Sequence, residues 1–159
     1  MKIWKEIALD FLRRSKEPLL QELNELDWKC SLSNDSERIA QHLSAFANYR
    51  GGGFIVFGVE NDGNFCGVTQ VECTEITKKL GNIARHNLEP GIALDFDVSK
   101  INGVNLLFVC ITESLVRPVH LRGKTLNDAY VRSAGTTRKM TKEEVKQCII
   151  QSSGIRYEE

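Results

Sequence analysis

Three consecutive glycines, Gly51, Gly52 and Gly53, stand where a helical pattern ends and an apolar run begins. Glycine tolerates positive φ angles and lets another backbone or a ligand approach closely. Successive N–H groups in such a turn can form a concave site for an anion. A tight helix-to-strand turn without a ligand is the simpler interpretation of the segment taken alone, so the anion site is a hypothesis.

Cationic side chains are concentrated between residues 117 and 142, where few acids accompany them. Together they could form a basic face that attracts the phosphates of a nucleic acid. Tyr49 and Arg50, just before the glycines, could add a stacking and a charge contact. The alternative for each cation is a solvated surface side chain. The candidate nucleic-acid-binding residues are Lys29, Tyr49, Arg50, Arg117, Arg122, Lys124, Arg132, Arg138 and Lys139.

The chain carries no net charge, because 21 Lys and Arg residues balance 21 Asp and Glu residues in a length of 159. Any polyanion binding must therefore rest on a local basic face. The five cysteines lack Cys-x-x-Cys spacing and predict reduced structural thiols, and the three histidines lack the spacing of a metal site. No apolar run approaches the ~18 residues of a membrane span, so we expect a cytoplasmic protein without membrane contact.

Hydrophobic periodicity predicts the elements that must position these residues. Residues 1–17 read as an amphipathic helix that packs on the core or on a second subunit. Residues 22–32 alternate like a half-buried strand that displays Asp27 and Lys29. Asn34 and Glu37 predict a capping box for the next helix. Residues 54–59 predict a central strand covered on both faces, and residues 74–87 another helix.

The second half of the chain predicts a hairpin, short strands and a last helix. Asn102-Gly103 separates two apolar runs at 94–101 and 104–111, a strong hairpin signal. Short strands follow at 119–121 and 129–132, and Thr141 with Glu144 predicts a capping box. This order predicts an α/β (α+β) domain with a single mixed sheet flanked by helices. We expect the domain to span residues 18–151, with a helix exit and the start of a linker at 152–159.

Three segments of the chain carry a family pattern: Leu26-Asp27-Trp28-Lys29, the run from Ser44 through the glycines to Gly63, and the run from Arg117 to Arg138. In these segments the chain resembles the Schlafen AlbA-like domain. In prokaryotes this domain is labelled DNA-binding, formerly a divergent AAA/ATPase domain, and it often begins transcriptional regulators. The resemblance spans residues 20 to 150 and implies an α/β fold with a nucleic-acid-binding role.

The resemblance also implies candidate catalytic carboxylates, since animal Schlafens cleave structured RNA with three acids. Glu22 and Asp27 match the first two positions, and Asn61, between Glu60 and Asp62, occupies the third. Such a nuclease would hold Mg²⁺ or Mn²⁺ on Glu22, Asp27 and either Glu60 or Asp62, and the ion would activate water. The shortened acid at Asp27 and the missing acid at Asn61 favour a binding module over an enzyme.

Nucleotide hydrolysis is not predicted, because Pro118 stands where a Walker A motif ending at Gly123-Lys124-Thr125 requires its first glycine. The expected role is a DNA- or RNA-binding module of a prokaryotic transcriptional regulator or defence-type protein. Its phosphate contacts would position the nucleic acid without reading its sequence. A metal-dependent endoribonuclease is one alternative. An oligomerisation module that forms a homodimer through the first helix is the other.

Overall fold

A four-stranded mixed sheet forms the centre of the computed structural model, which describes residues 2–16 and 23–158 and the side chains up to residue 152. Its strands, in spatial order, are β1 (Leu26–Lys29), β2 (Gly53–Phe57), β5 (Val104–Ile111) and β4 (Leu94–Ile101). β1 and β2 run parallel, and the other neighbours run antiparallel. The predicted α/β class with a mixed sheet flanked by helices is confirmed.

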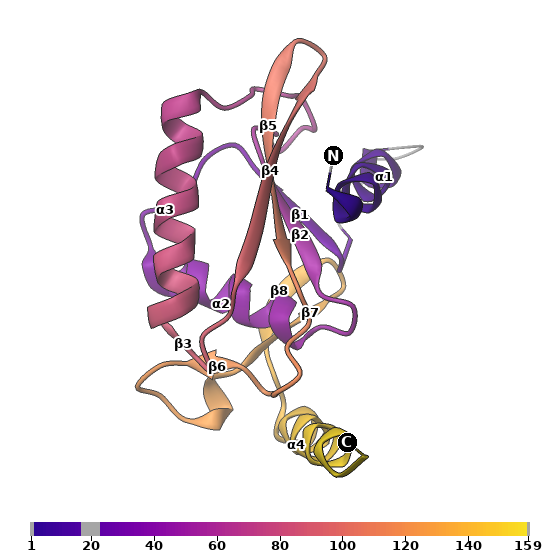
Figure 1. Ribbon diagram of the computed structural model, residues 1–159, viewed down its shortest axis with the longest axis vertical. Helices are drawn as coiled ribbons and strands as arrows, with labels where there is room; N and C mark the ends of the chain where they lie inside the picture. The colour runs from indigo at the N-terminus through magenta and orange to yellow at the C-terminus, as the bar shows by residue number, and fades with distance from the viewer. Residues whose placement is uncertain (1, 17–22, 159) are drawn as a thin grey trace.

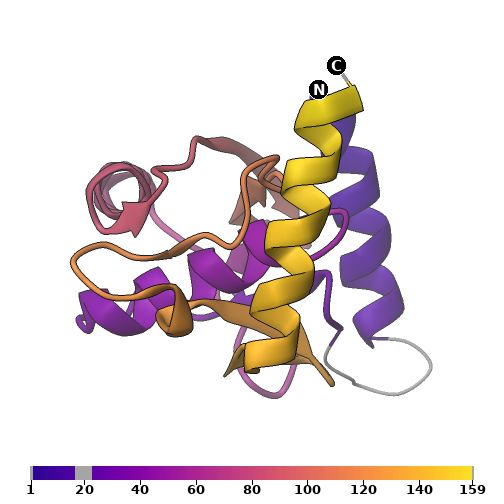
Figure 2. The ribbon, with the colours of Figure 1, turned by 90° about the horizontal axis from the view of Figure 1, so that it is seen from below.

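Helices cover both faces of this sheet (Figure 1). α2 (Ser36–Asn48) connects β1 to β2 and packs with α3 (Gln70–His86) on one face, where Ile55 and Phe57 of β2 are buried. α1 (Ile3–Lys16) packs on the other face against Phe54 and Val56. Figure 2 shows α1 and α3 again on opposite sides of the molecule. Because both faces are covered, every residue of β2 is buried, as the continuous apolar run predicts.

The predicted hairpin forms with the expected boundaries. β4 and β5 pair along their whole length from Leu94 with Ile111 to Ile101 with Val104. Asn102 and Gly103 at the turn both take positive φ angles, of 51° and 82°. Such angles match the right-handed twist of the two strands, which is why Asn-Gly is favoured at this position.

Two helix starts differ from their sequence predictions. Asp35, not Asn34, caps α2, and its side chain accepts a hydrogen bond from the backbone N–H of Arg38, so the predicted capping box with Glu37 is wrong. α3 begins at Gln70, earlier than predicted, because Thr69 and Glu72 form a reciprocal capping box. Charged and polar residues dilute the apolar periodicity in that first turn, so periodicity alone places the start too late.

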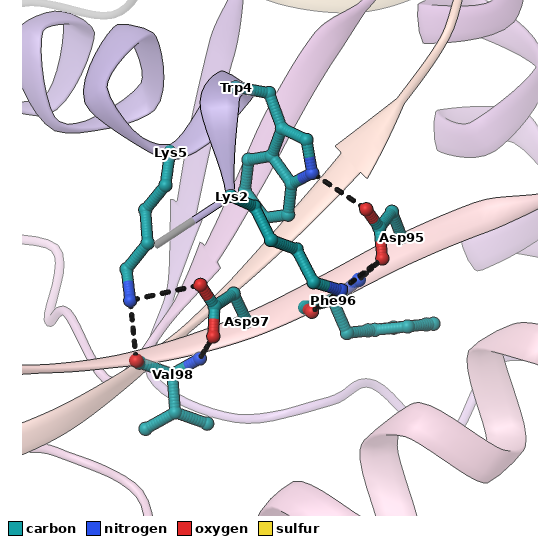
Figure 3. A network of polar contacts seen from close by, with 7 residues as sticks. All are labelled: Lys2, Trp4, Lys5, Asp95, Phe96, Asp97 and Val98. Carbon is teal, nitrogen blue, oxygen red and sulfur yellow. Dashed lines mark hydrogen bonds and ion pairs between the residues drawn. The ribbon is translucent and has the colours of Figure 1, made fainter.

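Polar contacts anchor α1 to the edge strand β4 (Figure 3). The buried Lys5 ammonium lies 3.1 Å from the carboxylate of Asp97 and donates to the carbonyl of Val98 at 2.6 Å. Trp4 Nε1 donates to the carboxylate of Asp95 at 2.7 Å. These partners lie more than 90 residues away in the chain. Polar contacts as well as apolar packing therefore hold α1 on its face of the central sheet.

The apolar stripe of α1 divides between core and solvent. Ala8 and Leu12 are buried, whereas Ile3 and Ile7 are 92% and 52% exposed. The prediction that α1 packs on the core is confirmed for the buried half of the stripe. Pairing with a second subunit remains a prediction.

Two small two-stranded sheets lie outside the central sheet. β3 (Leu88–Glu89) pairs with β6 (His120–Leu121), and β7 (Tyr130–Ser133) pairs with β8 (Thr136–Lys139). η1 (Leu126–Asp128) precedes β7, and α4 (Lys142–Glu158) follows β8. The capping box of Thr141 and Glu144 is present. The predicted helix exit at residue 152 is wrong, because α4 continues to Glu158. No helix in the described part of the chain has the length and apolar character needed to cross a membrane.

Candidate functional site

A pocket of about 380 Å³ opens where β1, α2 and the β7–β8 turn meet. Its base is apolar, formed by residues such as Ile39, Ile55 and Phe57. Its polar lining comprises Asp27, Lys29, Ser33, Arg38, His42, Arg132, Thr136 and Thr137. We call this the β1–α2 pocket. Its size is within the range of small-molecule sites, which are typically about 300–1,000 Å³.

Local periodicity places the polar groups on one side. Alternation along β1 turns Asp27 and Lys29 towards the pocket, while Leu26 and Trp28 pack with the α1-side core. Arg38 and His42 are four residues apart on α2 and therefore share a helix face. Neither Arg38 nor His42 is among the sequence candidates. Their i,i+4 spacing on the helix that follows β1 is the signal that could have found them.

The pocket has a cationic excess, with Lys29, Arg38 and Arg132 around one carboxylate, Asp27. Lys29 Nζ lies 3.2 Å from Asp27 Oδ2. Burial, reinforced by Lys29 and then opposed by Asp27, lowers the pKa of His42 to about 4. The imidazole is therefore neutral at pH 7, and its Nδ1 lies 2.8 Å from Thr137 Oγ1.

Arg132 stabilises the backbone that forms one wall of the pocket. It is 4% exposed, and its guanidinium donates to the backbone carbonyls of Leu23, Asn24 and Gly135. The guanidinium also lies 4.7 Å from the centroid of the Phe46 ring. These contacts join the β7–β8 turn to the segment before β1. The positive charge of Arg132 thus adds to the electrostatic potential in the pocket, and its N–H groups hold the surrounding backbone in place.

The glycine turn holds a carboxylate of the chain itself. Gly51 N donates to Glu113 Oε1 at 3.1 Å, and Glu113 also pairs with Arg117 at 2.8 Å. At Gly52, where φ is +69°, a Cβ would lie 2.2 Å from the carbonyl oxygen of Ile111. Close backbone packing therefore explains this glycine, and an internal anion already occupies the predicted anion site. Beside the turn, Tyr49 is half-buried and Arg50 is exposed.

The late cations do not form an unpaired basic face, because carboxylates from other elements approach them. Two of these acids come from distant segments, Glu37 of α2 and Glu89 of β3. The pairs are Arg117–Glu113 at 2.8 Å, Arg122–Glu89 at 3.9 Å, Lys124–Glu37 at 2.8 Å, Arg138–Glu144 at 2.7 Å and Lys139–Asp128 at 3.3 Å. A phosphate would have to compete with these neighbours. The sequence could not show these ion pairs, because folding brings Glu37 and Glu89 from distant segments close to the late cations.

The candidate carboxylates lie in different places. Asp27 lines the β1–α2 pocket, and Glu22 lies outside the described residues. Glu60 lies beside Cys30 and Cys66. Asp62 accepts hydrogen bonds from the backbone and side-chain nitrogens of Asn64 within its turn. The three-carboxylate site with Mg²⁺ or Mn²⁺ stays a prediction.

Comparison with protein families decides the identity of this fold. The family model described as Schlafen, AlbA_2 matches residues 22–141, most of the chain. The chain belongs to this Schlafen AlbA_2 family. The match begins just before β1 and ends before α4, so it includes every described element that lines the β1–α2 pocket. The resemblance inferred from sequence is confirmed. The domain boundaries at residues 18 and 151 remain predictions.

Two solved structures share the fold of this Schlafen AlbA_2 chain. The DIP2311 protein from Corynebacterium diphtheriae matches with a TM-score of 0.60 and 13% identity over 89% of this chain, which spans 27% of that protein. The N-terminal domain of a RecG-related protein from Nitrosomonas europaea matches with a TM-score of 0.59 and 18% identity, over 84% of this chain and 92% of that domain. No curated protein matches the chain.

Proposed function

We propose that this Schlafen AlbA_2 domain binds nucleic acid by placing a backbone phosphate in the β1–α2 pocket. The convergence of Lys29, Arg38 and Arg132 on one concave surface carries the proposal. Within a cavity of low dielectric, clustered cations concentrate the field that attracts an anion. The apolar base offers a surface for the sugar or base of the same nucleotide.

Two further considerations support nucleic acid as the ligand. In prokaryotes the Schlafen AlbA-like domain is labelled DNA-binding, and the name of the Nitrosomonas neighbour relates that protein to the DNA helicase RecG. The chain has no net charge, so a polyanion would be held by this local cluster rather than by a general positive field. Binding through phosphates would give weak sequence selectivity. A role in a transcriptional regulator or defence-type protein is part of the same proposal.

Fluorescence anisotropy with labelled hairpin RNA, single-stranded RNA and duplex DNA tests the pocket. The variant Lys29→Gln/Arg38→Gln removes the two pocket cations that do not order the wall. We expect weaker binding to every substrate and a salt dependence whose log–log slope falls by about 1–2. The matched control Arg122→Gln/Lys124→Gln removes two surface cations already paired with acids and should bind nearly as the natural chain does.

The opposite pattern of binding in the two variants would refute the proposal that the pocket binds the phosphate. Normal binding by the pocket variant, with loss in the control, would place the nucleic acid on the late cations instead. Asp27→Asn supplies a test of opposite sign, because it removes the carboxylate that faces Lys29 and should tighten binding.

The same variant separates binding from catalysis. Cleavage of labelled RNA that requires Mn²⁺ and disappears in Asp27→Asn would establish the metal-dependent nuclease, since a carboxylate ligand would then be essential. Tighter binding without cleavage would support the binding module.

A further inference from the structure

Two thiols and a carboxylate meet at the end of β1. The ligating atoms of Cys30, Glu60 and Cys66 all lie within 4.8 Å of one another, and the two sulfurs are 2.9 Å apart. All three residues are exposed. The sequence predicts structural thiols here, whereas the structure places Cys30 and Cys66 at the surface, side by side. None of the three lines the β1–α2 pocket.

Backbone hydrogen bonds hold this cluster together without any ligand. The carbonyl of Lys29, directly before Cys30, accepts from the backbone nitrogens of Gly58 and Val59 at 2.8 and 3.1 Å. The turn that follows is closed by the Val59–Phe65 bridge and by Gly67 N donating to Gly58 O at 2.9 Å. These contacts fix the backbone at all three positions, so ion binding would need only side-chain rotation.

We propose that Cys30, Cys66 and Glu60 bind a thiophilic divalent cation, with Zn²⁺ as the fitting ion. Zn²⁺ takes cysteine sulfur and carboxylate oxygen as ligands in a tetrahedral arrangement. With Zn–S bonds of about 2.3 Å, the sulfurs of a tetrahedral site lie about 3.8 Å apart. The sulfurs, now 2.9 Å apart, would have to separate by about 0.9 Å, and both side chains are exposed and free of core packing that would oppose rotation about χ1. Water occupies the fourth position, because the cluster faces solvent.

The position of Glu60 favours a cation over a disulfide, because its carboxylate lies within 4.8 Å of both sulfurs and is a ligand for a divalent ion. A divalent cation would attract the Glu60 carboxylate and the two thiolates that form when the ion binds. Binding changes no oxidation state. The two thiols release their protons to the solvent, and both sulfurs bond to the ion as thiolates. A disulfide would leave Glu60 without a role.

Titration of the reduced protein with Zn²⁺ against a chromophoric chelator tests the site. We expect one equivalent bound, with release of protons, and a thiolate-to-metal charge-transfer band when Co²⁺ replaces Zn²⁺. Cys30→Ser and Cys66→Ser should each weaken binding by at least about tenfold, the low end of the loss seen when even a supporting residue of a metal site is removed. Glu60→Gln should weaken it less, because both sulfurs remain.

Cys73→Ser is the matched control. Cys73 is a half-buried thiol beside the carboxylate of Glu72. It does not belong to the cluster of Cys30, Glu60 and Cys66, so its replacement should leave the affinity for Zn²⁺ unchanged. Circular dichroism of each variant verifies the fold. Zn²⁺ binding that survives Cys30→Ser, or that falls equally in Cys73→Ser, would refute the site. A Cys30–Cys66 disulfide that persists in excess reduced glutathione and prevents metal binding would also refute it.

Discussion

Asn48, at the end of α2, joins three segments of the fold and gives the sharpest test of its polar core. It is 4% exposed. Its Oδ1 accepts from the backbone N–H of Val119 at 2.7 Å, and its Nδ2 donates to the carbonyls of Val119 and Tyr130, both at 2.9 Å. The side chain therefore fixes the strand segments after residue 118 against α2.

Asn48→Ala should destabilise the domain by about 3–4 kcal/mol. The carbonyl of Val119 keeps its bond from Ser44 Oγ at 2.7 Å, so two backbone groups lose their bond to Asn48: the buried N–H of Val119 and the half-buried C=O of Tyr130. An unsatisfied buried group costs about 1–3 kcal/mol, so about 2 kcal/mol for Val119 and about 1–2 kcal/mol for the half-buried Tyr130 give the total. For a domain of this size the loss corresponds to a decrease in Tm of roughly 6–16 °C.

Urea denaturation followed by circular dichroism measures this free energy. Asn34→Ala is the matched control, because Asn34 is exposed before the helix cap and its replacement should stay within about 0.5 kcal/mol. A loss below about 1 kcal/mol in Asn48→Ala would refute the reasoning, since it would mean that water or local rearrangement satisfies both groups. An equal loss in both variants would show that the effect is not specific to the buried network.

Three further predictions concern the anchor of α1, the glycine turn and the β1–α2 pocket. Lys5→Ala should lower the unfolding free energy by about 2 kcal/mol in urea denaturation, because it leaves Asp97, whose side chain is 27% exposed, without its partner. The exposed Lys2, replaced by Ala, should cost about 1 kcal/mol or less, and an equal loss would contradict the anchor. Gly52→Ala should cost about 3 kcal/mol or more and Gly51→Ala about 1–2 kcal/mol, because both φ angles are positive but only the first Cβ meets backbone, at 2.2 Å. For His42, the folded pKa of about 4 lies below the ordinary 6.5, so its contribution is present above pH 6.5 and is lost as the pH falls to about 4. Stability measured across that interval should fall less steeply in His42→Gln, and an unchanged slope would refute the burial of a neutral imidazole.

The elements themselves follow from local patterns in the sequence. Asn102-Gly103 determines the hairpin because only residues that tolerate positive φ fit such a turn, and the structure agrees residue by residue. The continuous apolar run of β2 predicts burial on both faces, which is also found. Boundaries are less predictable where several polar residues compete to cap a helix, as Asn34 and Asp35 do before α2.

The candidate site was only partly predictable. Asp27 and Lys29 face the same pocket because strand alternation carries that information. The spacing of Arg38 and His42 places them on one face of α2, but only the packing of α2 on the sheet brings that face to the pocket. The late basic segment is the opposite case. Its sequence contains few acids, yet Glu37 and Glu89 approach from other elements.

By itself, the sequence determined the fold class and the family, because periodicity, turn residues and motifs are local properties. The tertiary structure alone decided which charges pair and which groups meet. Cys30 and Cys66 are 36 positions apart and become neighbours only when β1 pairs with β2 and the following turn closes. Electrostatic and coordination chemistry depend on distance in space, and folding sets that distance.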